Sequence, residues 1–314
     1  MRDGPVEMRF GTSWSTQFRL TQAIGRALSE LTPIKATVVV GERGDTSLER
    51  GDIDFCFLKS VVNEHRYTGK GFYAGREPST WLRTIAWLPQ EDRFFFAVAP
   101  WTGITSFEDI AAQKPALQMA GRVGAPLLEA YGFSFEDIER WGGSVGSVAH
   151  TARAAKERHD EGKLDALFGD GSAYDGTCWP WVAERGYRFL DIREDVMQQL
   201  ERRGLRRNIT VAGTFRGITQ NLLALDDSHI VATCHERLDD HLAYCLARAI
   251  DEQKRQIECE SIQVSYGESS ALPLTQTTYW SSLTSQVERQ WDPKILGAPL
   301  HPGAERYYKE RGVL

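Results

Sequence analysis

Apolar positions near the start of the chain alternate between short runs and one longer stretch with helical spacing. Residues 8–11, 35–40 and 51–58 have the short apolar runs of strands. The stretch between the first two, residues 17–31, repeats its apolar side chains at helical intervals. With a short helix expected at residues 46–50, this order of elements predicts the beginning of a parallel α/β sheet.

A similar pattern continues through the rest of the chain. Two more strands are expected at residues 82–88 and 93–99, and a second α/β unit restarts near residue 100. Its predicted helices and strands cover residues 106–110, 116–119, 127–131, 135–140, 148–161, 164–168, 179–185 and 188–192. The last part holds predicted strands at residues 222–225 and 230–233, helices at 238–256 and 281–290, and a tail helix.

This organisation predicts an α/β protein of two lobes with a cleft between them. Lobe 1 is expected to combine residues 1–99 with residues 214–314, and lobe 2 to hold residues 100–213. No Pro/Gly/Ser-rich tether separates them. Short crossovers near residues 99–102 and 211–216 are therefore expected to join the lobes.

The composition narrows the class of partner. The chain has 314 residues, of which 41% are hydrophobic and 25% charged, and its net charge is −6. An acidic chain without a basic face is not expected to bind nucleic acid, and no apolar run is long enough to insert into a membrane. Residues 1–7 lack the apolar core of a signal peptide. The protein is therefore expected in the periplasm if an upstream signal was removed, and in the cytoplasm otherwise.

Hydroxyl and indole side chains follow the first predicted strand. Thr12, Ser13, Trp14, Ser15 and Thr16 lead directly into the first long helix. The free N–H groups and positive dipole end of a helix N-terminus suit a carboxylate or a phosphate. The alternative is that these hydroxyls only cap the helix. Ligand contact is favoured because ligands of α/β proteins bind beyond the strand ends.

Cationic side chains occupy comparable turns. Arg122 sits at a predicted strand-to-helix turn of the second unit, where it could hold a carboxylate through two parallel hydrogen bonds. The alternative is a solvated surface arginine. Arg19, Lys59 and Arg216 are lesser candidates for the same role.

Asp170 lies between two glycines just beyond a predicted strand. It could bind an amine or a hydroxyl, or act as a general base, and the alternative is a turn aspartate that bonds its own backbone. The seven histidines include no pair at i, i+4 spacing and no HExxH motif. No metal site is therefore predicted.

The C-terminal segment carries a family resemblance. Residues 299–312 resemble the closing signature of the TAXI family, the solute receptors of TRAP-type transporters. Five more segments resemble segments of that family and follow the same order along the chain: residues 10–12, 48–54, 103–110, 162–168 and 212–217. Two ligand loops depart from it: residues 17–21 replace a Tyr-Tyr-Pro-x-Gly segment, and residues 121–126 replace a Gly-Ser-Gly turn.

The resemblance implies a type II periplasmic-binding-protein fold, with a mixed sheet flanked by helices in each lobe and a ligand cleft between the lobes. It implies a solute-binding protein that captures a small organic anion, a carboxylate with or without an aromatic part, by hinge closure and without a cofactor. Gly124 in the replaced turn, and Thr214, Phe215 and Arg216 in the segment similar to the return crossover, are implied ligand contacts. TRAP-type membrane subunits are the implied partners.

A cytosolic enzyme on the same fold is the alternative, such as a decarboxylase of an aromatic acid without an organic cofactor. The N-terminus without a signal peptide, the odd count of five cysteines and the altered ligand loops favour it. Asp170, His150 and Arg122 are then the catalytic candidates, because such chemistry needs an acid with a shifted pKa. A third interpretation is a ligand sensor that closes without turnover.

Overall fold

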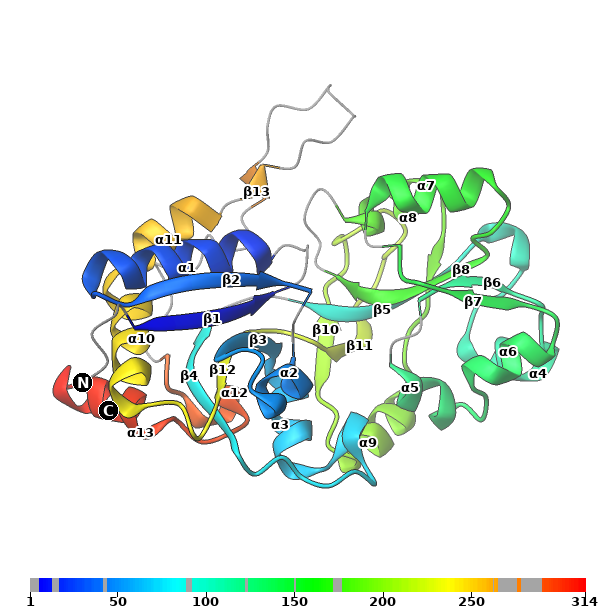
Figure 1. Ribbon diagram of the computed structural model, residues 1–314. Coiled ribbons are helices and arrows are strands. Elements are labelled where there is room, and N and C mark those ends of the chain that lie inside the picture. Colours follow the sequence, from blue (N-terminus) through cyan, green and yellow to red (C-terminus); the bar gives the residue numbers. More distant parts are fainter. Residues whose placement is uncertain are drawn as a thin grey trace.

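The computed structural model describes residues 6–12, 17–41, 44–88, 92–121, 124–149, 151–171, 177–261, 263–264, 276–277 and 290–314. These residues form two α/β lobes that lie side by side (Figure 1). Each lobe is built on a mixed sheet flanked by helices. The predicted fold class is confirmed.

The first lobe is built on a five-stranded sheet with the order β2-β1-β3-β12-β4. Strands β1 (Glu7–Thr12), β2 (Lys35–Val40) and β3 (Phe55–Lys59) run parallel, as the alternating pattern at the start of the chain predicts. Strand β12 (Ile230–His235) returns from the far part of the chain and pairs antiparallel with both β3 and β4 (Leu82–Leu88).

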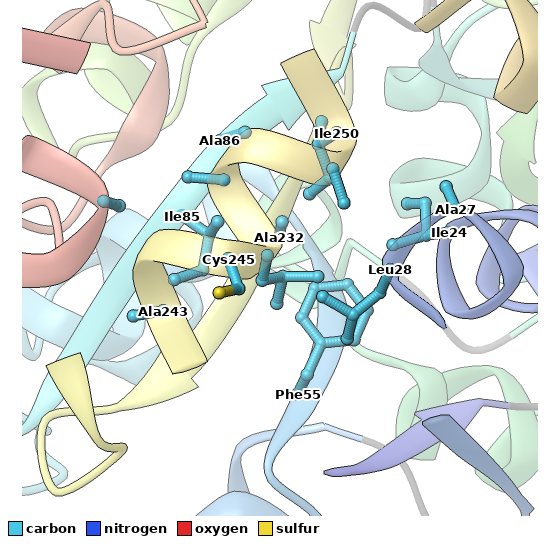
Figure 2. Packing of buried hydrophobic residues seen from close by; sticks show 14 of the residues in the cluster. Ile24, Ala27, Leu28, Phe55, Ile85, Ala86, Ala232, Ala243, Cys245 and Ile250 are labelled. Carbon is cyan, nitrogen blue, oxygen red and sulfur yellow. The ribbon is translucent and has the colours of Figure 1, made fainter. Parts of the chain in front are cut away.

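Helices cover both faces of this sheet. The main core lies under α1 (Gln17–Leu31), α10 (Asp240–Glu252) and α13 (Pro302–Glu310). Figure 2 shows its centre, where Ile24 and Leu28 of α1, Phe55 of β3 and Ile250 of α10 point toward one another. The other helices of this lobe are α2 (Asp45–Arg50), α3 (Ser60–Thr68), α11 (Lys254–Ser261) and α12 (Pro293–Leu296).

The second lobe has a seven-stranded sheet in the order β10-β11-β5-β8-β6-β7, with β9 paired to β5. Its strands are β5 (Arg93–Val98), β6 (Gln118–Ala120), β7 (Ser144–Gly146), β8 (Ala166–Gly171), β9 (Arg188–Phe189), β10 (Arg207–Thr210) and β11 (Leu222–Asp226). One face is covered by α4 (Phe107–Gln113), α5 (Ala125–Ala130), α6 (Phe135–Arg140) and α9 (Glu194–Arg202). The other face is covered by α7 (Ala152–Asp160) and α8 (Cys178–Glu184).

The remaining elements are short. Two 3-10 helices, η1 (Gly71–Tyr73) and η2 (Pro100–Thr102), follow α3 and β5. A two-stranded pair, β13 (Gln263–Val264) with β14 (Gln276–Thr277), follows α11. Among the described residues, no helix has the length and apolarity needed to cross a membrane.

The chain passes between the two sheets at residues 88–93 and 226–230, which differs from the expected crossovers near residues 99–102 and 211–216. Strands β5 and β11, expected in lobe 1, pair within the second sheet. The apparent restart near residue 100 is the 3-10 helix after β5, and residues 211–216 belong to the loop between β10 and β11. Two adjacent apolar strands, β4 and β5, look alike in the sequence, so the pattern could not show that the chain changes sheet between them.

Several other boundaries differ from the prediction. The helix expected at 148–161 begins at Ala152, with the Thr151 hydroxyl accepting from Ala154 N, and the helix expected at 238–256 is divided into α10 and α11. Helices α3 and α9 and strands β7 and β10 were not predicted. Most of the expected helix at 281–290 lies outside the described residues.

Candidate functional site

The carboxyl ends of strands from both lobes meet at the crossovers. Strands β1 and β3 run parallel in the first sheet, and β6 and β8 run parallel in the second. The end of β8 lies beside the start of β5, because Gly171 pairs with Arg93 just after the first crossover. Strand ends of this kind are where α/β proteins position ligand-binding side chains.

Four charged side chains gather there: Lys59, Asp92, Asp170 and Asp227, called the junction cluster below. The ammonium group of Lys59 at the end of β3 lies 2.5 Å from Asp92 Oδ2 and 3.1 Å from Asp227 Oδ2. It also donates to the backbone carbonyl of Asp227 at 3.1 Å. One cation from the first lobe therefore binds both crossovers at once.

The crossovers are also hydrogen-bonded to each other. Asp227 N donates to Asp92 O at 3.1 Å, and the Ser228 hydroxyl donates to the same carbonyl at 2.9 Å. Ser228 Oγ in turn accepts from Asp92 N at 3.1 Å. These bonds fix Asp92 and Asp227 relative to Lys59.

Burial and charge shift the proton affinities of this cluster. Burial lowers the pKa of Lys59, but the charges of Asp227, Asp92 and Asp170 together raise it above its usual value. Burial raises the pKa of Asp92 and raises that of Asp227 more strongly, and the Lys59 charge opposes both shifts. Lys59 therefore carries its charge at neutral pH and stabilises the two buried carboxylates.

Asp170 differs from the other members of the cluster. Within the described parts of the chain, its carboxylate has neither a hydrogen-bond donor nor an ion-pair partner. It is half-buried at the end of β8, where the backbone carbonyl of Asp170 accepts from Trp179 Nε1 at 3.2 Å. A carboxylate so placed is available to accept hydrogen bonds from a group outside the protein.

The cluster also has the geometry of a cation site. One carboxylate oxygen from each of Asp92, Asp170 and Asp227 can be chosen so that all three lie within 4.8 Å of one another. The Lys59 ammonium already bonds two of these carboxylates, so it does here what a cation would do.

Residues 15–312 match the NMT1-like family. The chain belongs to the NMT1-like family. The narrower resemblance to TAXI receptors stays a prediction.

Solved structures of binding proteins resemble the NMT1-like chain at low identity. An ABC-transporter choline-binding protein in complex with choline is 15% identical, over 98% of this chain and 98% of that one, with a TM-score of 0.46. The glycine betaine/L-proline-binding protein ProX from Borrelia burgdorferi is 10% identical, over 81% and 91%, with a TM-score of 0.46. A TRAP periplasmic solute-binding protein from Sulfitobacter with bound β-D-galacturonate is 11% identical, over 80% of each chain, with a TM-score of 0.39.

Only some of the predicted site residues of the NMT1-like chain lie at the junction. Thr12 ends β1 and is buried, and its backbone carbonyl accepts from Gly41 N at 2.9 Å. Lys59 and Asp170 belong to the junction cluster. Arg19 is exposed on the first turn of α1. The residues that lie outside the described part of the chain are Ser13, Trp14, Ser15, Thr16, Arg122 and His150.

Gly124 directly precedes α5 and has a backbone conformation that favours glycine. Its φ of 65° is in the left-handed region, and a Cβ there would lie 2.5 Å from the ring of Phe168. The glycine therefore allows the turn after β6 to approach the core of lobe 2 closely. This packing role accounts for Gly124 without a ligand.

Thr214, Phe215 and Arg216 lie away from the junction. They belong to the loop at the hairpin end of β10 and β11, whereas the second crossover leaves the opposite end of β11. Phe215 is buried in the core of lobe 2 and stacks on Phe189, with ring centroids 5.3 Å apart. These three residues are therefore not brought together with Lys59 and Asp170.

Asp92 and Asp227 are functional candidates that the sequence did not predict. Each directly adjoins a strand, β5 or β11, at the turn between the lobes. A run of polar residues between apolar strands, as in Asp226 to His229, was the available signal. This run does not stand out in the sequence, because the pattern of elements predicts the crossovers elsewhere.

The two lobes also contact each other beside the two crossovers. His65 of α3 bonds the carbonyl of Gly204 in lobe 2 through Nε2 at 2.8 Å, and its Nδ1 accepts from Phe72 N at 3.2 Å. Phe72 packs on the core of lobe 2. Arg206 reaches back from lobe 2 to Ser60 Oγ at 3.1 Å and to the Glu64 carboxylate. The lobes of the NMT1-like chain are therefore joined along one side by more than the two crossovers.

Proposed function

We propose that this protein is a solute-binding protein that holds a small organic carboxylate between its lobes. We further propose that Asp170 accepts a hydrogen bond from an amine or hydroxyl on the same ligand. The observation that carries the proposal is the Asp170 carboxylate, which accepts no hydrogen bond and forms no ion pair within the described chain, although the neighbouring aspartates are paired with Lys59. A carboxylate left unpaired at converging strand ends suits a ligand donor.

The proposal that the ligand carries a carboxylate rests on the sequence. Helix α1 has 15 residues and begins at Gln17, directly after the loop of hydroxyl side chains that starts at Thr12. The N-terminus of such a helix favours an anion. Arg122 is the expected second anchor. A ligand with both an anionic and a donor group would use both sides of the cleft.

Closure of the lobes on the ligand is part of the proposal. The crossovers and the His65–Gly204 contact all lie on the joined side. Rotation about these fixed points would open and close the opposite side, as in hinge-closing binding proteins. TRAP-type transporter subunits are the partners that the TAXI resemblance implies, and the periplasm is the compartment that such a partnership requires.

A thermal-shift screen tests the proposal. The panel contains simple carboxylates, hydroxy-carboxylates and amino-carboxylates of matched size, and each hit is recovered and analysed by mass spectrometry. We expect hits among the hydroxy- or amino-carboxylates, returned unchanged, because a bound ligand raises the melting temperature.

Two results would count against the proposal. A panel without any stabilising member would contradict a carboxylate ligand. A hit that is consumed would favour the decarboxylase alternative, with Asp170, His150 and Arg122 as the residues to test.

A further inference from the structure

A pocket of about 550 Å³ lies in lobe 2, away from the junction cluster. Its apolar base is formed by the buried side chains of Phe189, Ile218 and Leu222, which belong to the core between the sheet and α8. Arg188 and Arg216 line it from two different segments, β9 and the loop between β10 and β11. Pairing of β9 with the last residues of β5 places this pocket at the end of β5 that is farther from the crossover.

The wall that carries Arg216 is held in shape by its own contacts. Within residues 211–221, Gly213 N donates to Ile218 O at 2.8 Å, and Ala212 N donates to Asn221 Oδ1 at 2.9 Å. Phe215 and Ile218 anchor the loop because both are buried in the core of lobe 2. Arg216 lies between these anchors and is exposed. Its backbone position is therefore fixed, and its exposed side chain lines the pocket.

The wall that carries Arg188 is fixed in a similar way. The preceding Tyr187 is buried, its N–H donates to Val182 O at 3.1 Å, and its hydroxyl donates to Leu164 O at 2.7 Å. Arg188 follows in β9, where it pairs with Val98 of β5. Two short segments of different origin thus present one arginine each to one pocket.

The charges in the pocket favour an anion. Neither Arg188 nor Arg216 has a hydrogen-bond or ion-pair partner in the part of the chain that the structure describes. The acidic residue in the lining is Asp191, one oxygen of which accepts from Leu223 N at 2.6 Å. Two guanidinium groups beside one carboxylate leave a positive excess over an apolar base. Arg193, which is also exposed, is instead paired with Glu108 and Asp195.

We propose that this pocket is a second ligand site, which takes a small carboxylate with an apolar body. The carboxylate would accept hydrogen bonds from Arg188 and Arg216, and the apolar body would cover Phe189, Ile218 and Leu222. Guanidinium groups suit this role because they donate two parallel hydrogen bonds to a carboxylate. The site is independent of the junction cluster and of any ligand bound there.

An NMR titration of the full chain tests this assignment, with benzoate as the probe and benzamide as its neutral counterpart. We expect benzoate to shift the backbone amide signals of Gly186, Arg188, Arg216 and Gly217 in a saturable manner. Benzamide should do so much more weakly. The double variant R188Q/R216Q should weaken benzoate binding at this site about tenfold, as the loss of charge-assisted hydrogen bonds predicts.

The matched control is R202Q, which removes an exposed arginine of α9 that does not line this pocket. It should leave benzoate binding unchanged. Equal shifts with benzoate and benzamide would overturn the proposal, as would equal weakening by R202Q and R188Q/R216Q. Shifts confined to residues around Asp170 would assign benzoate to the junction alone and would also overturn it, while leaving the proposed function intact.

Discussion

The ammonium group of Lys59 lies 2.5 Å from the carboxylate of Asp92, and this ion pair joins the end of a lobe 1 strand to the first crossover. The same ammonium reaches Asp227 on the second crossover. The exposed fractions of the three side chains are 16%, 2% and 4%, so water screens the pairs little. The ammonium group of Lys59 thus binds both crossovers, and the half-buried Asp170 lies beside it.

Replacing Lys59 by methionine should destabilise the protein, because it leaves two buried carboxylates without their cation. We expect the free energy of unfolding to fall by about 3–5 kcal/mol near neutral pH, measured by urea denaturation. The pKa values of Asp92 and Asp227 are raised by burial, and Lys59→Met would raise them further. A buried acid whose pKa is raised in the folded state makes the protein less stable as pH rises. The stability lost through Lys59→Met should therefore be larger at about pH 8 than at about pH 5. A deficit independent of pH would contradict this account.

Asp170→Asn and Asp92→Asn should have opposite effects. Asp170 forms no ion pair in the described chain, so its replacement should change the free energy of unfolding by only about 0.5 kcal/mol while abolishing ligand-dependent stabilisation. Asp92→Asn breaks the pair with Lys59 and should cost about 2–4 kcal/mol. Thermal unfolding with and without a hit from the screen measures both effects. Equal destabilisation by the two variants would show that Asp170 is a structural residue.

His65 should make the contact between the lobes sensitive to acid. Burial lowers its pKa from the usual 6.5, while the nearby charges of Glu64 and Arg206 act in opposite directions. His65 takes up a proton more readily in the unfolded chain than in the folded protein. Its contribution to stability is therefore complete above about pH 6.5 and is lost as pH falls toward the pKa of His65 in the folded state. His65→Gln should flatten this fall between about pH 7 and pH 5, as measured by urea denaturation. An unchanged slope would exclude His65 as the source.

Phe215→Ala should harm stability and spare ligand binding. The Phe215 ring is buried, stacks on Phe189, and lies 5.5 Å from the ring of Phe95. Its removal leaves a cavity in lobe 2 that should cost about 3–5 kcal/mol. Binding at the junction, measured by calorimetry well below the melting temperature, should be unchanged. A selective loss of junction binding would restore Phe215 as a ligand contact.

Gly303→Ala tests why the C-terminal segment needs a glycine. A Cβ at this position would lie 2.0 Å from the carbonyl oxygen of Asp240, where α13 crosses the start of α10. We expect a loss of about 2 kcal/mol or more in the free energy of unfolding, because two packed helices must separate. Lys309→Ala on the exposed side of α13 is the control and should cost about 0.5 kcal/mol. Equal losses would contradict the packing argument.

The fold could be predicted because its strands and helices are marked locally. The parallel strands β1, β2 and β3 and the long helix α1 were visible as apolar runs and helical periodicity. The tail was also predicted to be a helix, and α13 confirms this. Its first residues pair with the edge of the first sheet, where His301 N donates to Thr84 O at 2.8 Å, and Tyr308 donates to Ile85 O at 3.0 Å.

The site could be predicted only in part, because it depends on where the chain changes sheet. Lys59 and Asp170 were found, since each follows an apolar strand in its own lobe. Asp92 and Asp227 were missed because their importance comes from lying on the two crossovers, which is a property of the fold and not of either segment. Arg216 was expected at the junction because a crossover was predicted near residues 211–216. The structure places Arg216 at the pocket in lobe 2.

The most direct test of solute binding at the junction is calorimetric titration of the strongest hit from the screen into the wild-type chain and into Asp170→Asn. The account predicts one ligand per chain, recovered unchanged, with binding lost or weakened about a hundredfold in the variant at equal thermal stability. Unaltered affinity in a stable Asp170→Asn protein would contradict the assignment of Asp170 to the ligand. Consumption of the hit would contradict the proposal of a binding protein.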